Sequence, residues 1–124
     1  MSEALRYLNN AKEILKNAPI EGNNYTDVKY VQEACGTAYL AILKAIDEYL
    51  LKQGLLKKEL PKSEKAYTIA LRKYLSIHNG KLFKEFGYLY DELHIAGYYR
   101  GLLHNVDRVK DVLKSTKDFI EKIE

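Results

Sequence analysis

A strict alternation of three- and four-residue steps between apolar residues constrains the fold of this chain more than any other feature. The positions that follow it are Val28, Val31, Cys35, Ala38, Ile42, Ala45 and Tyr49. Residues at such steps share one face of an α-helix, so we expect a helix over residues 26–53 that forms the central packing seam. Gly36, Leu40 and Leu43 fall outside the seam and make a second stripe. This stripe is either buried on another side of the helix or faces a second subunit.

The same spacing predicts four further helices. They cover residues 2–18, 63–78, 81–96 and 106–123. Gly54 and the Asn79-Gly80 pair are stop and turn signals between helices, and Asn105 is placed to cap the last helix. No stretch alternates polar and apolar residues with a period of two, so no strand is expected. Residues 1–124 are therefore predicted to form one all-α domain, an antiparallel up-and-down helical bundle of four to five helices.

The charge and hydropathy patterns indicate a cytoplasmic protein without a membrane segment. No apolar run approaches the roughly 20 residues that a membrane helix needs, and the N-terminus lacks the order of a signal peptide. The 20 basic and 17 acidic side chains give a net charge of +3, and the densest basic cluster is Lys57, Lys58, Lys62 and Lys65. A nucleic-acid surface calls for a stripe or a stronger excess, so this pattern supports nucleic-acid binding only weakly.

The chain has one cysteine and three scattered histidines, which give no spacing typical of metal ligands, and no cofactor motif is present. Cys35 lies on the alanine-rich seam, and we predict that it is buried and unreactive rather than a nucleophile. Eleven tyrosines stand beside three phenylalanines and no tryptophan. Tyrosine suits the rim of a core or an interface, and it also suits a surface on which bases stack.

The stretch from Tyr98 to Asn105 carries the only concentration of candidate chemistry. An arginine can hold a phosphate and a histidine can transfer protons near neutral pH, so Arg100 and His104 form a possible metal-independent ribonuclease pair if they share a helix face. In the alternative, Arg100 pairs with Asp91 or Asp107 and His104 bonds to a backbone carbonyl. The candidate ligand-binding residues of this stretch are Tyr98, Tyr99, Arg100, His104 and Asn105.

Three segments resemble the HEPN superfamily, the small helical bundles found with minimal nucleotidyltransferases, and within it an uncharacterised bacterial branch. They are residues 4–18, residues 25–54, which contain the sequence AYLAILKAIDEYLLKQG, and residues 93–123, which have the sequence LHIAGYYRGLLHNVDRVKDVLKSTKDFIEKI. The resemblance implies a homodimer and a nucleotidyltransferase or antitoxin partner. Catalytic members place a histidine shortly after an arginine that is followed by a polar residue, at a site on the dimer interface. Only Arg100 and His104 match here, at a shorter interval and with Gly101 in the polar position.

The residues and the resemblance together leave three alternative functions. The first is a non-catalytic HEPN-like module that binds a partner protein or a nucleotide-like ligand, because members without the motif act as binding subunits. The second is a toxin-like ribonuclease that uses Arg100 and His104. The third is a purely structural interaction domain. We expect any homodimer to use the second stripe of the long helix (Gly36, Leu40, Leu43) or the tyrosine-rich end near Tyr98.

Overall fold

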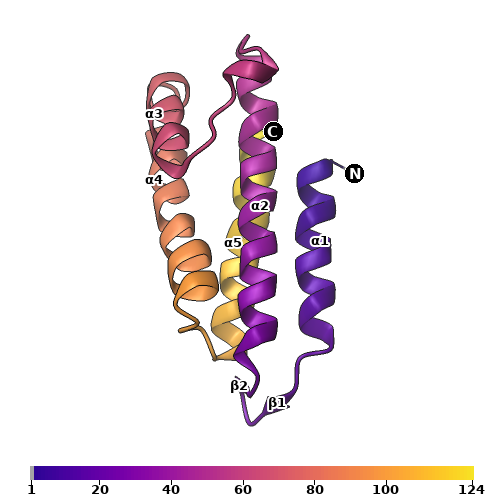
Figure 1. Ribbon diagram of the computed structural model, residues 1–124. Helices are drawn as coiled ribbons and strands as arrows, with labels where there is room; N and C mark the ends of the chain where they lie inside the picture. Colours follow the sequence, from indigo (N-terminus) through magenta and orange to yellow (C-terminus); the bar gives the residue numbers. More distant parts are fainter. Residues whose placement is uncertain (1) are drawn as a thin grey trace.

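The structure is a computed structural model that describes residues 2–124, and it confirms an all-α antiparallel bundle (Figure 1). The elements in chain order are α1 (Glu3–Lys16), β1 (Ile20–Glu21), β2 (Asn24–Tyr25), α2 (Val28–Lys52), the 3-10 helix η1 (Lys57–Glu59), α3 (Glu64–Tyr74), α4 (Gly80–Leu89), the π-helix η2 (Tyr90–Tyr99) and α5 (Val106–Ile123). In Figure 1, α1 leads down to β1 and β2, α2 leads up, α4 leads down and α5 leads up again. None of the helices formed by residues 2–124 is long and apolar enough to span a membrane.

The helices begin where the sequence places polar caps. The hydroxyl of Ser2 accepts a hydrogen bond from the backbone N–H of Leu5 at 3.2 Å, which caps α1. The side chain of Asn105 accepts from the N–H of Arg108 at 2.9 Å and caps α5 in the same way. Such caps satisfy N–H groups that have no partner inside the helix, so they fix the starting points of the bundle's outer helices.

α2 is the centre of the core, as its seam predicts. Val31, Cys35, Ala38, Ile42 and Ala45 are all at most 1% exposed. The helix contacts α1, η2 and α5, so it is covered on several sides. The second stripe is covered less completely: Leu43 is half-buried, and Leu40 keeps 48% of its surface exposed. Part of the stripe therefore lies open on the surface of the single chain.

The prediction that the chain has no strand is wrong at the connection between α1 and α2. Ile20 pairs with Tyr25 and Glu21 pairs with Asn24 in an antiparallel hairpin, whose turn contains Gly22 at a φ of 64°. Two-residue strands are too short to show a polar–apolar alternation, which is why the sequence gives no sign of them.

This hairpin also holds the chain that enters α5. The N–H of Tyr25 donates to the carbonyl of His104 at 2.8 Å, and the N–H of Val106 donates to the carbonyl of Asn23 at 2.9 Å. These backbone hydrogen bonds join segments about eighty residues apart in the sequence, at the lower end of the bundle in Figure 1.

The helix predicted over residues 81–96 continues to Tyr99, and its second half is a π-helix. The N–H of Arg100 donates to the carbonyl of Ile95 at 2.8 Å, five residues back, and Gly101 ends the helix at a φ of 60°. Gly97 explains how η2 can lie so close to α2, because a Cβ there would stand 2.5 Å from the sulfur of Cys35. π-helical turns are rare and often occur at functional sites, so the surface beside η2 is a candidate functional site.

Candidate functional site

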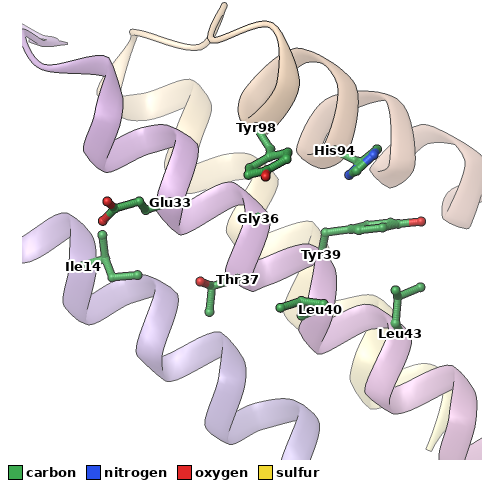
Figure 2. A pocket seen from close by; sticks show the side chains of 9 residues that line it. All are labelled: Ile14, Glu33, Gly36, Thr37, Tyr39, Leu40, Leu43, His94 and Tyr98. Carbon is green, nitrogen blue, oxygen red and sulfur yellow. The ribbon is translucent and has the colours of Figure 1, made fainter.

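The aromatic groove, as we name it, lies between α1, α2 and η2 and has a volume of about 630 Å³ (Figure 2). Its lining residues are Ile14, Glu33, Gly36, Thr37, Tyr39, Leu40, Leu43, His94 and Tyr98. The volume falls within the range of about 300–1,000 Å³ that small-molecule sites occupy. The open part of the second stripe thus forms one wall of a hollow that a ligand can enter.

A column of stacked rings runs along η2, and two of its members, His94 and Tyr98, line this groove. The ring centroids of Tyr90 and His94 are 5.4 Å apart at 25°, and those of His94 and Tyr98 are 5.7 Å apart at 20°. Tyr39 of α2 adds a fourth ring, 5.0 Å from His94. The three η2 rings are four residues apart, and a π-helix has more residues per turn than an α-helix. Four residues are slightly less than one such turn, so the three rings lie on one face of the helix.

A glycine and a glutamine fix the position of Tyr98. A Cβ built on Gly36 would lie 2.8 Å from Cδ1 of Tyr98, so the ring occupies space that only a glycine leaves open. The side-chain amide of Gln32 donates to the backbone carbonyl of Tyr98 at 3.1 Å. Tyr98 still exposes 48% of its surface, so the ring is held in place and remains accessible.

The charged groups of the site lie toward one end of the groove. Glu33 is the charged residue that lines it. A second hollow of about 310 Å³ adjoins this end, and both Glu33 and Tyr98 line it together with Lys29 and Tyr99. The rings of the aromatic groove are therefore followed, along the same surface, by one carboxylate and one ammonium group.

The structure distributes the predicted ligand-binding residues unequally around this site. Tyr98 lines both hollows, and Tyr99, which is 74% exposed, lines the smaller one. Arg100 is exposed at the end of η2, and its side chain makes no hydrogen bond or ion pair with residues 2–124. Neither Asp91 nor Asp107, the two alternative partners, forms an ion pair with Arg100, and Asp107 instead accepts a hydrogen bond from the amide of Asn23 at 2.9 Å.

His104 and Asn105 belong to the support of α5 rather than to the groove. His104 is exposed and uses its backbone carbonyl to bind the hairpin, while Asn105 caps α5. Because Gly101 ends η2, the residues between Arg100 and His104 are not helical, and the two side chains do not share a helix face. The geometric condition for a cooperating Arg100–His104 pair is thus not met by this backbone.

The whole chain, residues 1–124, matches the family described as "Domain of unknown function (DUF5618)". The chain belongs to this family. A protein of unknown function from Dyadobacter fermentans is similar over 98% of this chain and 89% of its own, with 31% sequence identity and a TM-score of 0.78. A crystal structure of a Sulfolobus solfataricus protein is similar in fold, with 19% identity, a TM-score of 0.75 and coverage of 99% and 94%. No curated protein matches the chain.

Two rings of the site in this DUF5618 domain were not among the predicted residues. They are His94 and Tyr39, both of which line the aromatic groove. The sequence does contain a signal for one of them, because Tyr90, His94 and Tyr98 repeat at four-residue steps. Tyr39 gives no such signal, since its contact with His94 depends on how closely η2 approaches α2.

Cys35 lies beneath the site and does not line it. The thiol is 1% exposed, and burial raises its pKa to about 12, with a smaller contribution from the charge of Glu92. A buried thiol of this kind stays protonated near neutral pH, in agreement with the predicted burial. Among residues 2–124, no three His, Cys, Asp or Glu side chains are grouped closely enough to hold a metal ion.

Proposed function

We propose that this protein is a non-catalytic, HEPN-like binding module that holds a planar, nucleotide-like ligand in the aromatic groove. The observation that carries the proposal is the stacked pair His94 and Tyr98, which lines an open groove of about 630 Å³ together with Tyr39. Aromatic side chains bind nucleobases by stacking, at about 1–3 kcal/mol per base. Rings that are already fixed by packing lose little conformational freedom when a ligand stacks on them.

The polar groups around the rings suit the rest of a nucleotide. The carboxylate of Glu33 can accept hydrogen bonds from the amino group of a base, and the hydroxyl of Thr37 can donate or accept one. Lys29 lines the adjoining hollow, where its ammonium group can attract a phosphate. The arrangement of groove and hollow therefore supports a ligand with a flat apolar part and an anionic part.

Helix order and the broken motif support the HEPN-like, non-catalytic part of the proposal. The chain has a short first helix, a long second helix and a long closing helix, as the resemblance implies. A ribonuclease mechanism needs the arginine and the histidine at one reacting phosphate. Arg100 and His104 stand on either side of the left-handed Gly101, and neither lines the groove or its hollow.

A nuclear magnetic resonance titration tests the proposal. The ¹⁵N-labelled protein is titrated with AMP, CMP, GMP and UMP, and we expect shifts of amide signals around Gly36 and Tyr98 with at least one of them. Tyr98→Ala should weaken that binding by about tenfold or more, because it removes a stacking face. Tyr88→Ala is the matched control, since Tyr88 is 50% exposed and lies on α4 outside the groove. Equal affinity in the two variants, or no shifts with any nucleotide, would refute the proposal.

One observation favours a second candidate, a homodimer formed through the same face. The two predicted dimer surfaces, the stripe with Leu40 and the tyrosine-rich end with Tyr98, turn out to line one groove. Both residues are 48% exposed, so the single chain leaves a joined apolar surface open. Sedimentation equilibrium at micromolar concentration tests this candidate. A dimer that Leu40→Glu converts to monomer would support it, and a wild-type monomer would exclude it.

A further inference from the structure

A second groove lies on the other side of α1, between α1 and α5, and we name it the lysine groove. Its volume is about 600 Å³. Leu15, Ile20, Tyr25, Val106 and Leu113 form an apolar floor that reaches from the hairpin along both helices. Ile20 is 53% exposed at the hairpin end, although most of the floor is at least half-buried. The surface is therefore an apolar channel that the single chain leaves uncovered.

Five lysines border this channel on both sides. Lys12 and Lys16 stand on α1, and Lys110, Lys114 and Lys117 stand on α5. Steps of three and four residues place each set on one face of its helix. Lys16 forms an ion pair with Glu13 at 2.6 Å, whereas the other four make no ion pair with residues 2–124. None of the residues that line the groove is acidic, so the positive charge is not neutralised within it.

The groove lysines and the aspartates of α5 lie on two neighbouring faces of the helix. At about 100° per residue, Lys110, Lys114 and Lys117 fall within about 60° of one another around the helix. The aspartates of α5 fall together on the next face; they are Asp107, Asp111 and Asp118. Glu121 falls on the lysine face one turn beyond Lys117 but does not line the groove, so the part of α5 that borders the groove carries positive charge alone.

We propose that the lysine groove is a docking surface for an amphipathic helix of a partner protein whose apolar face is flanked by acidic residues. The floor would cover the apolar face, and the lysines on α1 and α5 would meet carboxylates on the two flanks of the incoming helix. One-turn spacing of the lysines matches carboxylates spaced by one turn on a partner helix. The site is separate from the aromatic groove, and it extends the protein's function beyond the one proposed above.

Other ligands fit these features less well. A nucleic-acid backbone would use the lysines and leave the apolar floor uncovered. A single fatty-acid carboxylate would use the floor and one or two of the five ammonium groups. An acidic amphipathic helix uses the floor and both rows of lysines together, so the combination of charge and apolar surface favours it.

The probe is a synthetic peptide of about 18 residues, or five helical turns, with leucines on one face and glutamates beside them. Two control peptides replace the glutamates by lysines or the leucines by glutamines. Fluorescence anisotropy at low salt should show binding of the acidic amphipathic peptide, and both controls should bind roughly tenfold more weakly or less. Binding of the leucine-free peptide at full strength would identify a simple polyanion site and overturn the proposal, as would equal binding of the lysine peptide or no peptide binding.

Variants of the protein locate the binding. The triple variant Lys110→Glu, Lys114→Glu and Lys117→Glu should lose roughly tenfold in affinity or more. Its matched control carries the same charge change at the exposed residues Lys57, Lys58 and Lys62, and it should bind as the wild type does. Equal losses in the two triple variants would show an effect of net charge alone and overturn the proposal.

Two further measurements separate the remaining explanations. Ile20→Gln changes an exposed residue of the floor, and we expect it to weaken binding while the melting temperature stays within a few degrees. Unchanged affinity in Ile20→Gln would remove the floor from the interaction and contradict the proposal. Dodecanoate that shifts the groove's amide signals, in a protein that binds no peptide, would instead identify a small carboxylate site and overturn it.

Discussion

The two grooves beside α1 have similar volumes, about 630 and 600 Å³, and opposite chemistry. One is walled by the three aromatic rings of Tyr39, His94 and Tyr98 and carries a single carboxylate, while the other has an apolar floor and five lysines. The same helix borders both, with Ile14 on one side and Leu15 on the other. The difference shows that the packing of this bundle determines where hollows form, whereas a few residues at the flanks of α1 determine what each hollow can bind.

The two grooves also differ in how firmly their walls are fixed. Tyr98 rests against Gly36, and its backbone carbonyl is bound by Gln32, so the aromatic wall is set before any ligand arrives. The lysines of the other groove are exposed and mostly without partners, and their flexible side chains adjust to what binds. We therefore expect binding in the lysine groove to weaken with added salt, and binding in the aromatic groove to depend much less on it.

The largest expected effect concerns the core that both grooves share. Ile42 is fully buried at the centre of α2, and Ile42→Ala should lower the free energy of unfolding by about 2–5 kcal/mol. Urea unfolding followed by circular dichroism measures the loss. Leu40→Ala is the control on the same helix, because Leu40 is 48% exposed and should cost far less. Equal losses in the two variants would mean that the seam of α2 is not the core on which the helices around both grooves pack.

A smaller effect should distinguish the aromatic groove from the lysine groove. The Cβ added by Gly97→Ala would stand 2.5 Å from the sulfur of Cys35, and relief of this clash requires η2 to move away from α2. We expect a loss of about 1–3 kcal/mol, with amide shifts around Tyr98 and none around Lys114. In the double variant with Cys35→Ala, the loss should be less than the sum of the two single losses. Additive losses would show that the sulfur of Cys35 does not limit the approach of the helices.

Two tyrosines, Tyr39 in the wall of the aromatic groove and Tyr67 on α3, should respond to loss of the hydroxyl with opposite signs. The hydroxyl of Tyr39 is buried without a hydrogen-bond partner in residues 2–124, whereas that of Tyr67 donates to Asp47 at 2.8 Å. Tyr39→Phe should raise the free energy of unfolding by about 1 kcal/mol, and Tyr67→Phe should lower it by about as much. Thermal unfolding of the two variants measures both. A destabilised Tyr39→Phe would mean that the Tyr39 hydroxyl has a bound partner, such as a water molecule.

The smallest effect is expected at His104, which lies outside both grooves. Its side chain is exposed, so His104→Ala should change the free energy of unfolding by no more than about 0.5 kcal/mol. We also expect no cleavage of RNA by the wild-type protein in the presence of a chelator. Cleavage that persists with the chelator and disappears in His104→Ala would establish the ribonuclease alternative and make the aromatic groove secondary.

The sequence was sufficient to predict the fold because its main signals are local. The seam of α2 and the cap at Asn105 depend on residues within a few positions of one another, and the structure confirms them. The hairpin at Ile20 and the π-helix after Leu89 have no such local pattern. They depend on contacts with distant segments, above all the fit of Gly97 against Cys35.

The two sites were predictable to different extents for the same reason. Tyr98 was predicted from its polar and aromatic neighbours in the sequence, whereas Tyr39 joins it only through the packing of η2 on α2. The densest lysine cluster in the sequence, around Lys57, lies on the exposed connector. The lysines that actually converge, such as Lys12 and Lys114, are about a hundred residues apart and belong to antiparallel helices. No pattern within a short stretch of the sequence reveals that these lysines border the same groove.

The π-helix changes the direction in which the residues that follow it point around the helix axis. An element with five-residue hydrogen bonds contains more residues in the same length than an α-helix does, so each downstream side chain is rotated relative to α4. If one residue were removed from η2, Tyr98 would take the place of Gly97 against Cys35, and Tyr99 would take the place of Tyr98 above Gly36. The unusual winding thus determines which of two adjacent tyrosines enters the groove and which one faces solvent.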